Sequence, residues 1–109
     1  MNKAIVIFRN YKAGILTEKE DGYYFEYDSE YLKREDAEPI SLTLPLQSQP
    51  FFDKVLFPFF DGLIPEGWLL EIVEKNWKID PRDRMGLLMT CCKDCIGAVG
   101  IIKSESDNL

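Results

Sequence analysis

One fifteen-residue stretch, from Phe57 to Glu71, constrains the fold of this chain more than any other. It contains four aromatic residues, two prolines and two glycines. Pro58 and Pro65 cannot lie inside a helix, but each suits the first turn of one. The stretch therefore predicts a short helical turn from Pro58 to about Leu63, then a break, then a new helix beginning at Pro65. Its apolar side chains form too large a patch to remain in water, so we expect a hinge of the hydrophobic core here.

The residues before this stretch predict an antiparallel meander. Runs of β-branched and aromatic residues alternate with turn signals at Asn10–Lys12 and at Asp21-Gly22, a strong hairpin pair. The predicted strands are Lys3–Arg9, Ala13–Glu18 and Tyr23–Tyr27. Because side chains alternate along a strand, Tyr23, Phe25 and Tyr27 should share one face that is at least partly buried.

Two further elements are predicted between the meander and the central stretch. Asp28 or Ser29 can cap a single helical turn that continues to Leu32. The strict alternation of Ile40–Leu44 predicts a fourth strand, with Ile40, Leu42 and Leu44 pointing inward.

The second half of the chain predicts helices and a closing strand. Apolar residues at helical spacing predict a helix from Pro65 to about Lys78. Asp80 before Pro81 predicts the start of another helix, which carries Met85, Leu87, Leu88 and Met89 and ends near Cys92. A last strand, Gly97–Ile102, should rejoin the sheet. The predicted class is α+β: one small domain, residues 1–103, with an N-terminal antiparallel meander, two or three helices packed on it and a closing C-terminal strand, followed by a flexible tail at 104–109.

Composition narrows the possible functions. A chain of 109 residues suits a single domain, and its formal net charge of −6 argues against direct nucleic-acid binding. An acidic chain is better suited to a basic partner surface. No signal peptide or membrane-length apolar run is visible, so we expect a cytoplasmic protein.

The residue types present argue against catalysis. The chain has no histidine, which excludes His-assisted nucleophiles, and it has no phosphate-cradling glycine loop. We therefore expect no enzyme activity, no cofactor and no metal. Cys92 and Cys95 form a C-x-x-C pair, so a small thiol oxidoreductase remains an alternative. The pair lies at a predicted helix C-terminus, where the helix dipole opposes thiolate formation, and a four-sulfur zinc site would need one more cysteine.

Four blocks of this sequence resemble the N-terminal subdomain of HipA-type serine/threonine kinases. They occur in the order and spacing of that family and together cover most of residues 3–102. The blocks are Pro39–Leu46, Phe59–Gly67, Asp80–Asp83 with Leu87-Leu88, and Asp94–Val99.

The resemblance implies a function in a three-part toxin–antitoxin system. In such systems a HipS-like antitoxin neutralises a HipT-like kinase toxin by protein–protein docking, and a HipB-like DNA-binding protein completes the set. An alternative is that the domain is a regulatory lobe that assists its kinase rather than a kinase inhibitor.

The partner-binding surface should lie on the family's signature stretch. Trp77 falls on the apolar side of the Pro65–Lys78 helix and is predicted to be core, whereas Trp68 falls at the rim. An exposed tryptophan beside a glycine is a common anchor for a protein partner, although Trp68 could also fold back on Phe59 or Phe60. The predicted partner-binding residues are Phe59, Asp61, Gly62, Leu63, Pro65, Glu66, Gly67 and Trp68.

Overall fold

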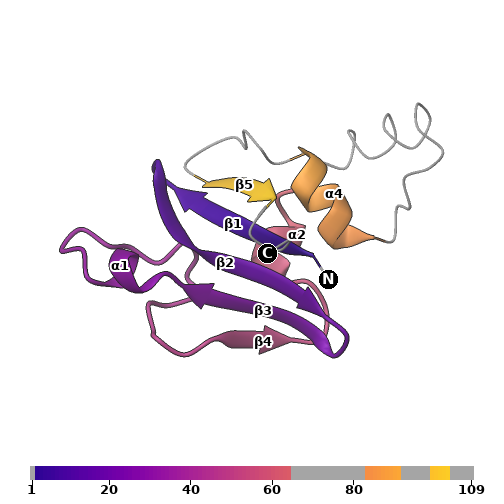
Figure 1. Ribbon diagram of the computed structural model, residues 1–109, viewed down its shortest axis with the longest axis horizontal. Helices are drawn as coiled ribbons and strands as arrows, with labels where there is room; N and C mark the ends of the chain where they lie inside the picture. The colour runs from indigo at the N-terminus through magenta and orange to yellow at the C-terminus, as the bar shows by residue number, and fades with distance from the viewer. Residues whose placement is uncertain (1, 65–82, 92–98, 104–109) are drawn as a thin grey trace.

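The computed structural model describes residues 2–64, 83–91 and 99–103, and in this part of the chain a single antiparallel sheet forms the centre (Figure 1). The strands, in chain order, are β1 (Lys3–Phe8), β2 (Tyr11–Lys19), β3 (Gly22–Tyr27), β4 (Phe51–Asp53) and β5 (Val99–Lys103). Their order across the sheet is β4-β3-β2-β1-β5. The predicted meander is therefore confirmed, and so is the closing strand, which pairs with β1.

Two tight turns join the strands of the meander. Arg9 and Asn10 link β1 to β2 with φ angles of 53° and 72°. Two successive positive φ angles are typical of the hairpin turns that match strand twist. Lys19 pairs with Gly22 across the second turn, so the loop residues are Glu20 and Asp21. Both predicted turns are confirmed, each about one residue earlier than the sequence indicated.

One face of the sheet carries the core. Leu16 of β2 lies between Ala4 of β1 and Phe25 of β3, and all three side chains are buried. Tyr27 follows on the same face, also buried, and Tyr23 is half-buried there. The predicted shared face of the three β3 aromatics is confirmed.

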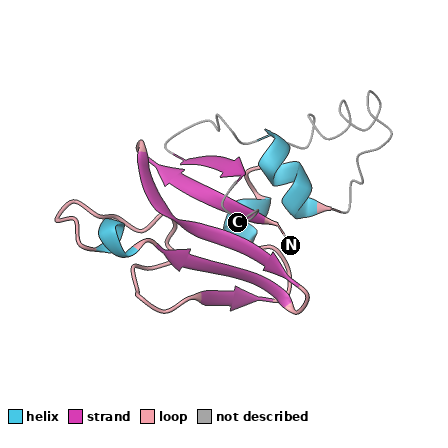
Figure 2. Ribbon diagram, viewed as in Figure 1, coloured by secondary structure: helices cyan, strands magenta, loops and turns pink. Residues whose placement is uncertain are grey.

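Three short helices lie beside the sheet in the described part of the chain (Figure 2). They are α1 (Ser29–Leu32), α2 (Pro58–Asp61) and α4 (Arg84–Cys91). Asp28 caps α1, as predicted, because its carboxylate accepts the backbone N–H of Tyr31. α4 lies against α2 and β5, and its Met85, Leu87 and Leu88 are buried. The α+β class with helices on an antiparallel sheet is confirmed.

The fourth predicted strand is wrong. Ile40–Leu44 forms a tight turn, in which Ser41 and Leu44 make one isolated bridge. Ile40 and Leu44 are buried as expected, but Leu42 points into solvent and is 98% exposed. The fourth strand is instead β4, which follows the loop and pairs with Tyr23, Tyr24 and Phe25 of β3.

The start of α4 also differs from the prediction. Asp83 precedes the helix and caps it, since its side chain accepts the Gly86 N–H at 3.0 Å and its carbonyl accepts the Leu87 N–H at 3.0 Å. The helix therefore begins three residues later than the predicted start at Pro81. The predicted Pro65–Lys78 helix, Trp68, Trp77, Asp80, the Cys92/Cys95 pair and the 104–109 tail lie outside the described residues.

Candidate partner-binding surface

The candidate surface begins with α2. Residues of the Phe57–Glu71 stretch itself set where this helix starts and ends. Pro58 occupies the first turn, where its missing N–H is no loss, and Phe57 precedes it in an extended conformation. The Asp61 and Gly62 N–H groups both close the turn, donating to the carbonyls of Phe57 and Pro58 at 2.9 Å. Gly62 ends the helix. The predicted turn from Pro58 to about Leu63 is thus confirmed.

Phe60 fixes α2 on the sheet. Its ring is fully buried, with its centroid 5.5 Å from that of Phe25 on β3 and 6.1 Å from that of Phe57. Phe59 packs edge-on against Phe60 at 5.2 Å and remains half-buried. Burying a phenylalanine contributes about 1.5–3 kcal/mol, so this contact holds a four-residue helix that could not persist alone.

Asp61 connects α2 to α4. Its Oδ1 accepts a hydrogen bond from Arg84 Nε at 2.6 Å, a contact between residues 23 positions apart. The Asp61 side chain is 43% exposed and that of Arg84 is 34% exposed. An ion pair this accessible contributes little to stability, about 0–1 kcal/mol, but it sets the position of a carboxylate at the surface.

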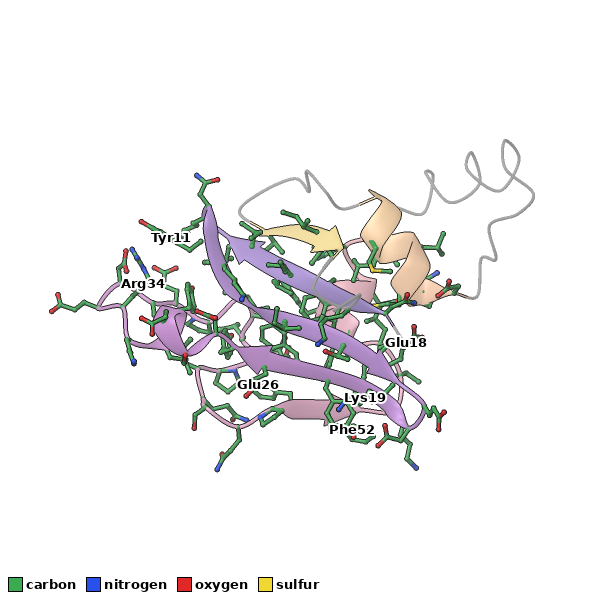
Figure 3. All side chains as sticks on the ribbon, in the orientation of Figure 1. Tyr11, Glu18, Lys19, Glu26, Arg34 and Phe52 are labelled. Carbon is green, nitrogen blue, oxygen red and sulfur yellow. The ribbon has the colours of Figure 1, made fainter. Side chains whose placement is uncertain are left out.

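Three carboxylates lie close enough to Tyr23 of β3 to affect its ionisation. The pKa of the Tyr23 phenol is raised by partial burial and then by Glu18, Asp83 and Asp61, whose charges oppose its ionisation. Tyr23 also donates a hydrogen bond to Glu18 Oε2 at 3.3 Å. Figure 3 shows Glu18 at the end of the sheet where α4 begins, whereas Tyr11 and Arg34 lie at the opposite end near α1. The α2–α4 end is therefore an acidic rim around half-buried apolar side chains, which suits a basic partner.

The structure brings together four of the predicted site residues. Phe59 and Leu63 are half-buried against the core, Asp61 pairs with Arg84, and Gly62 is exposed. The other four, Pro65, Glu66, Gly67 and Trp68, lie outside the described residues and stay predictions. Sequence reasoning missed Arg84, because a single arginine after Asp83 carries no local signal of a partner so distant in the chain.

The part of the chain that the structure describes contains neither a metal-ligand cluster nor a membrane-spanning helix. Within residues 2–64, 83–91 and 99–103, no three acidic or cysteine side chains converge as metal ligands. Across the same ranges, no helix has the length and apolar character needed to cross a membrane. The described residues of this region present half-buried apolar side chains and an accessible carboxylate.

The described residues form a small α+β domain, and comparison with known proteins identifies its family. The family described as the HipA N-terminal domain matches residues 4–102. This chain belongs to that family.

Similar proteins differ widely in length. An uncharacterized protein of Haemophilus influenzae is 35% identical over 88 residues, which is 81% of this chain and 79% of that protein. A putative kinase of Sinorhizobium fredii, Y4mE, is 28% identical over 76% of this chain, but the match spans only 20% of the kinase. The solved structure of the N-terminal domain of HipA toxin has a TM-score of 0.77 and 30% identity, and the match covers 96% of this chain and 94% of that one.

Proposed function

We propose that this chain is a HipS-like antitoxin that binds and neutralises a HipT-like kinase by docking. One observation carries the proposal: the same domain is a fifth of the length of a putative kinase and most of the length of a small relative. A domain that packs on a kinase within one chain can make the same contacts from a separate chain.

The docking surface in this proposal is the α2–α4 end of the domain. Half-buried Phe59 and Leu63 supply apolar area, and the Asp61 carboxylate sits at their edge. Apolar centres with a charged rim are typical of specific protein interfaces. The predicted residues from Pro65 to Trp68 follow directly in the chain and belong to the same proposed surface.

Neutralisation requires no chemistry from this chain. In this proposal the chain is not an enzyme and binds no cofactor, because the sequence has neither a histidine nor a phosphate-cradling loop. It would act in the cytoplasm, in a ternary complex with a HipB-like DNA-binding protein.

The proposal predicts that a HipT-like kinase is encoded beside this chain, and the test uses that kinase, purified separately. Calorimetry measures binding, and a phosphorylation assay measures kinase activity with and without the chain. We expect tight binding and loss of kinase activity. Binding with increased activity would favour an assisting lobe, and no binding would refute the proposal.

A charge-reversed pair of variants tests the position of the interface. Asp61→Arg places a cation on the acidic rim and should weaken kinase binding tenfold or more, about 1.4 kcal/mol. Glu26→Arg makes the same charge change at an exposed site of β3, on the opposite face of the sheet from Phe25 and Tyr27, and should bind like the unmodified chain. Equal affinities for the two variants would place the interface elsewhere.

A further inference from the structure

The segment between α1 and β4 holds a tight turn at Ser41–Leu44 that the proposed function does not yet use. The Leu44 N–H donates to the Ser41 carbonyl at 3.1 Å, which closes the turn. The Ser41 hydroxyl accepts the Thr43 N–H at 3.2 Å and lies 3.0 Å from the Thr43 hydroxyl. Side-chain hydroxyls that bond nearby backbone in this way favour turns over strands.

A buried tyrosine clamps both ends of this turn to the sheet. The Tyr27 hydroxyl accepts the Ile40 N–H at 3.0 Å and donates to the Leu44 carbonyl. Pro39 and Pro45 flank the clamped segment, and each ring fixes the φ angle of its own residue, which restricts the chain on either side. The turn is therefore held rigidly in one conformation.

Leu42 sits at the tip of the turn with its side chain 98% exposed, whereas Ile40 and Leu44 are 6% and 2% exposed. Scattered exposed leucines are ordinary on protein surfaces. This one differs because hydrogen bonds, prolines and a buried clamp all hold it outward. Pre-organised apolar side chains bind well, since little conformational entropy remains to be lost on binding.

The turn stands on the same face of the sheet as α2. Tyr27 holds the turn, and Phe25 contacts Phe60 of α2. The two residues are two positions apart on β3 and point to the same side, about 7 Å from each other along the strand. One partner can therefore touch both features at once.

We propose that the Ser41–Leu44 turn is a second docking point, at which Leu42 inserts into an apolar pocket of the protein that also contacts α2. This inference rests on the proposed function and adds a site to it. The exposed prolines at positions 39 and 45 and the partly exposed Leu46 surround the tip with further apolar area. The pocket is thus one lined by aliphatic or aromatic side chains.

Charge favours a different protein over a second copy as the occupant. Two copies would each bring a formal net charge of −6 and an acidic rim on the same face as the turn. A basic partner is attracted to this face, and a second copy is repelled from it.

The experiment titrates Leu42→Ser against the purified kinase by calorimetry, alongside thermal melts. We expect Leu42→Ser to melt like the unmodified chain, because the side chain makes almost no burial contribution, and to bind the kinase at least tenfold more weakly. Leu42→Met keeps an apolar side chain of similar volume and should retain most of the affinity. Ile102→Ser is the matched control, since Ile102 is 46% exposed on the opposite face of the sheet.

The outcomes separate the two proposals. If the unmodified chain binds the kinase and Leu42→Ser binds within twofold of it, the docking point is refuted and the proposed function stands. If the unmodified chain does not bind, the proposed function and its partner are both refuted. Leu42-dependent dimerisation in sedimentation would overturn the choice of occupant.

Discussion

Replacing Tyr27 with phenylalanine should destabilise the domain far more than the loss of one oxygen atom suggests. The hydroxyl bonds the Ile40 N–H and the Leu44 carbonyl, and Tyr27 is only 3% exposed. Phenylalanine fills the same space but leaves two backbone groups buried without partners. Each such loss costs about 1–3 kcal/mol, so the two together should cost roughly 2–6 kcal/mol. That is a large share of the roughly 5–15 kcal/mol by which a whole domain is typically stable.

Tyr31 provides a matched comparison. Its ring stacks on that of Tyr27, with centroids 6.1 Å apart and planes inclined by 6°. Its hydroxyl also bonds one backbone N–H and one carbonyl, both of Glu38, at 3.2 and 2.6 Å. Glu38 is exposed, so water can replace those bonds, and Tyr31→Phe should cost about 1 kcal/mol.

Urea unfolding and thermal melts of both variants check the prediction. For a domain near this size, each kcal/mol lowers the Tm by about 4–8 °C, so Tyr27→Phe should melt at least about 8 °C below the unmodified chain. The reasoning is refuted if Tyr27→Phe melts within about 3 °C of the unmodified chain, or if Tyr31→Phe is the less stable of the two.

Alkaline pH gives an independent signature of the buried hydroxyl. Burial raises the pKa of Tyr27 above 10.0, Tyr31 adds to the rise and the Ile40 N–H opposes it. The Tyr27 phenol ionises at a lower pH in the unfolded chain than in the folded one. The stability that its hydroxyl contributes is therefore fully present below the unfolded pKa, and it is lost as pH rises through the higher folded pKa. The stability gap between the unmodified chain and Tyr27→Phe should therefore narrow above pH 10.0. A gap independent of pH would contradict this account.

Three further predictions test the sheet, the rim and the signature stretch. Gly14→Ala should lose about 1–3 kcal/mol in urea unfolding, because the added Cβ would collide with the Glu26 carbonyl oxygen, and a loss below about 0.5 kcal/mol would contradict it. Arg84→Ala should lose less than about 1 kcal/mol by the same measurement, since its ion pair is solvent-accessible, and a larger loss would show a buried role. Trp77→Ala should lose about 3–5 kcal/mol, whereas Trp68→Ala should fold normally and bind the kinase about thirtyfold more weakly; similar melts for the two variants would refute that assignment.

Local signals predicted the meander well. Each hairpin is closed by adjacent residues, so Asp21-Gly22 and the alternation around Phe25 carry the information within a few positions. The cap of α1 is equally local, because Asp28 reaches an N–H only three residues ahead. Sequence patterns therefore predict a contact well when its two residues are close together in the chain.

Contacts between distant segments were not predictable in this way. β4 has three residues, too few for a period, and it exists because it pairs with β3 across a long loop. Asp61 meets Arg84 only after the core has brought α2 and α4 together. At α4, two aspartates of the Asp80–Asp83 block could each serve as a cap, and the sequence pattern gave no reason to prefer Asp83.

The wrong prediction for Leu42, which points into solvent rather than inward, has a different cause. A period of two in Ile40–Leu44 is satisfied equally by a strand and by a turn whose first and last residues are buried. The side chains decide between them here. The Ser41 hydroxyl accepts the Thr43 N–H and contacts the Thr43 hydroxyl, and the Tyr27 hydroxyl bonds the Ile40 N–H and the Leu44 carbonyl. The result is a leucine displayed to solvent on a rigid support. Departures from local sequence rules often mark functional surfaces, which is why the proposed second docking point is placed at Leu42.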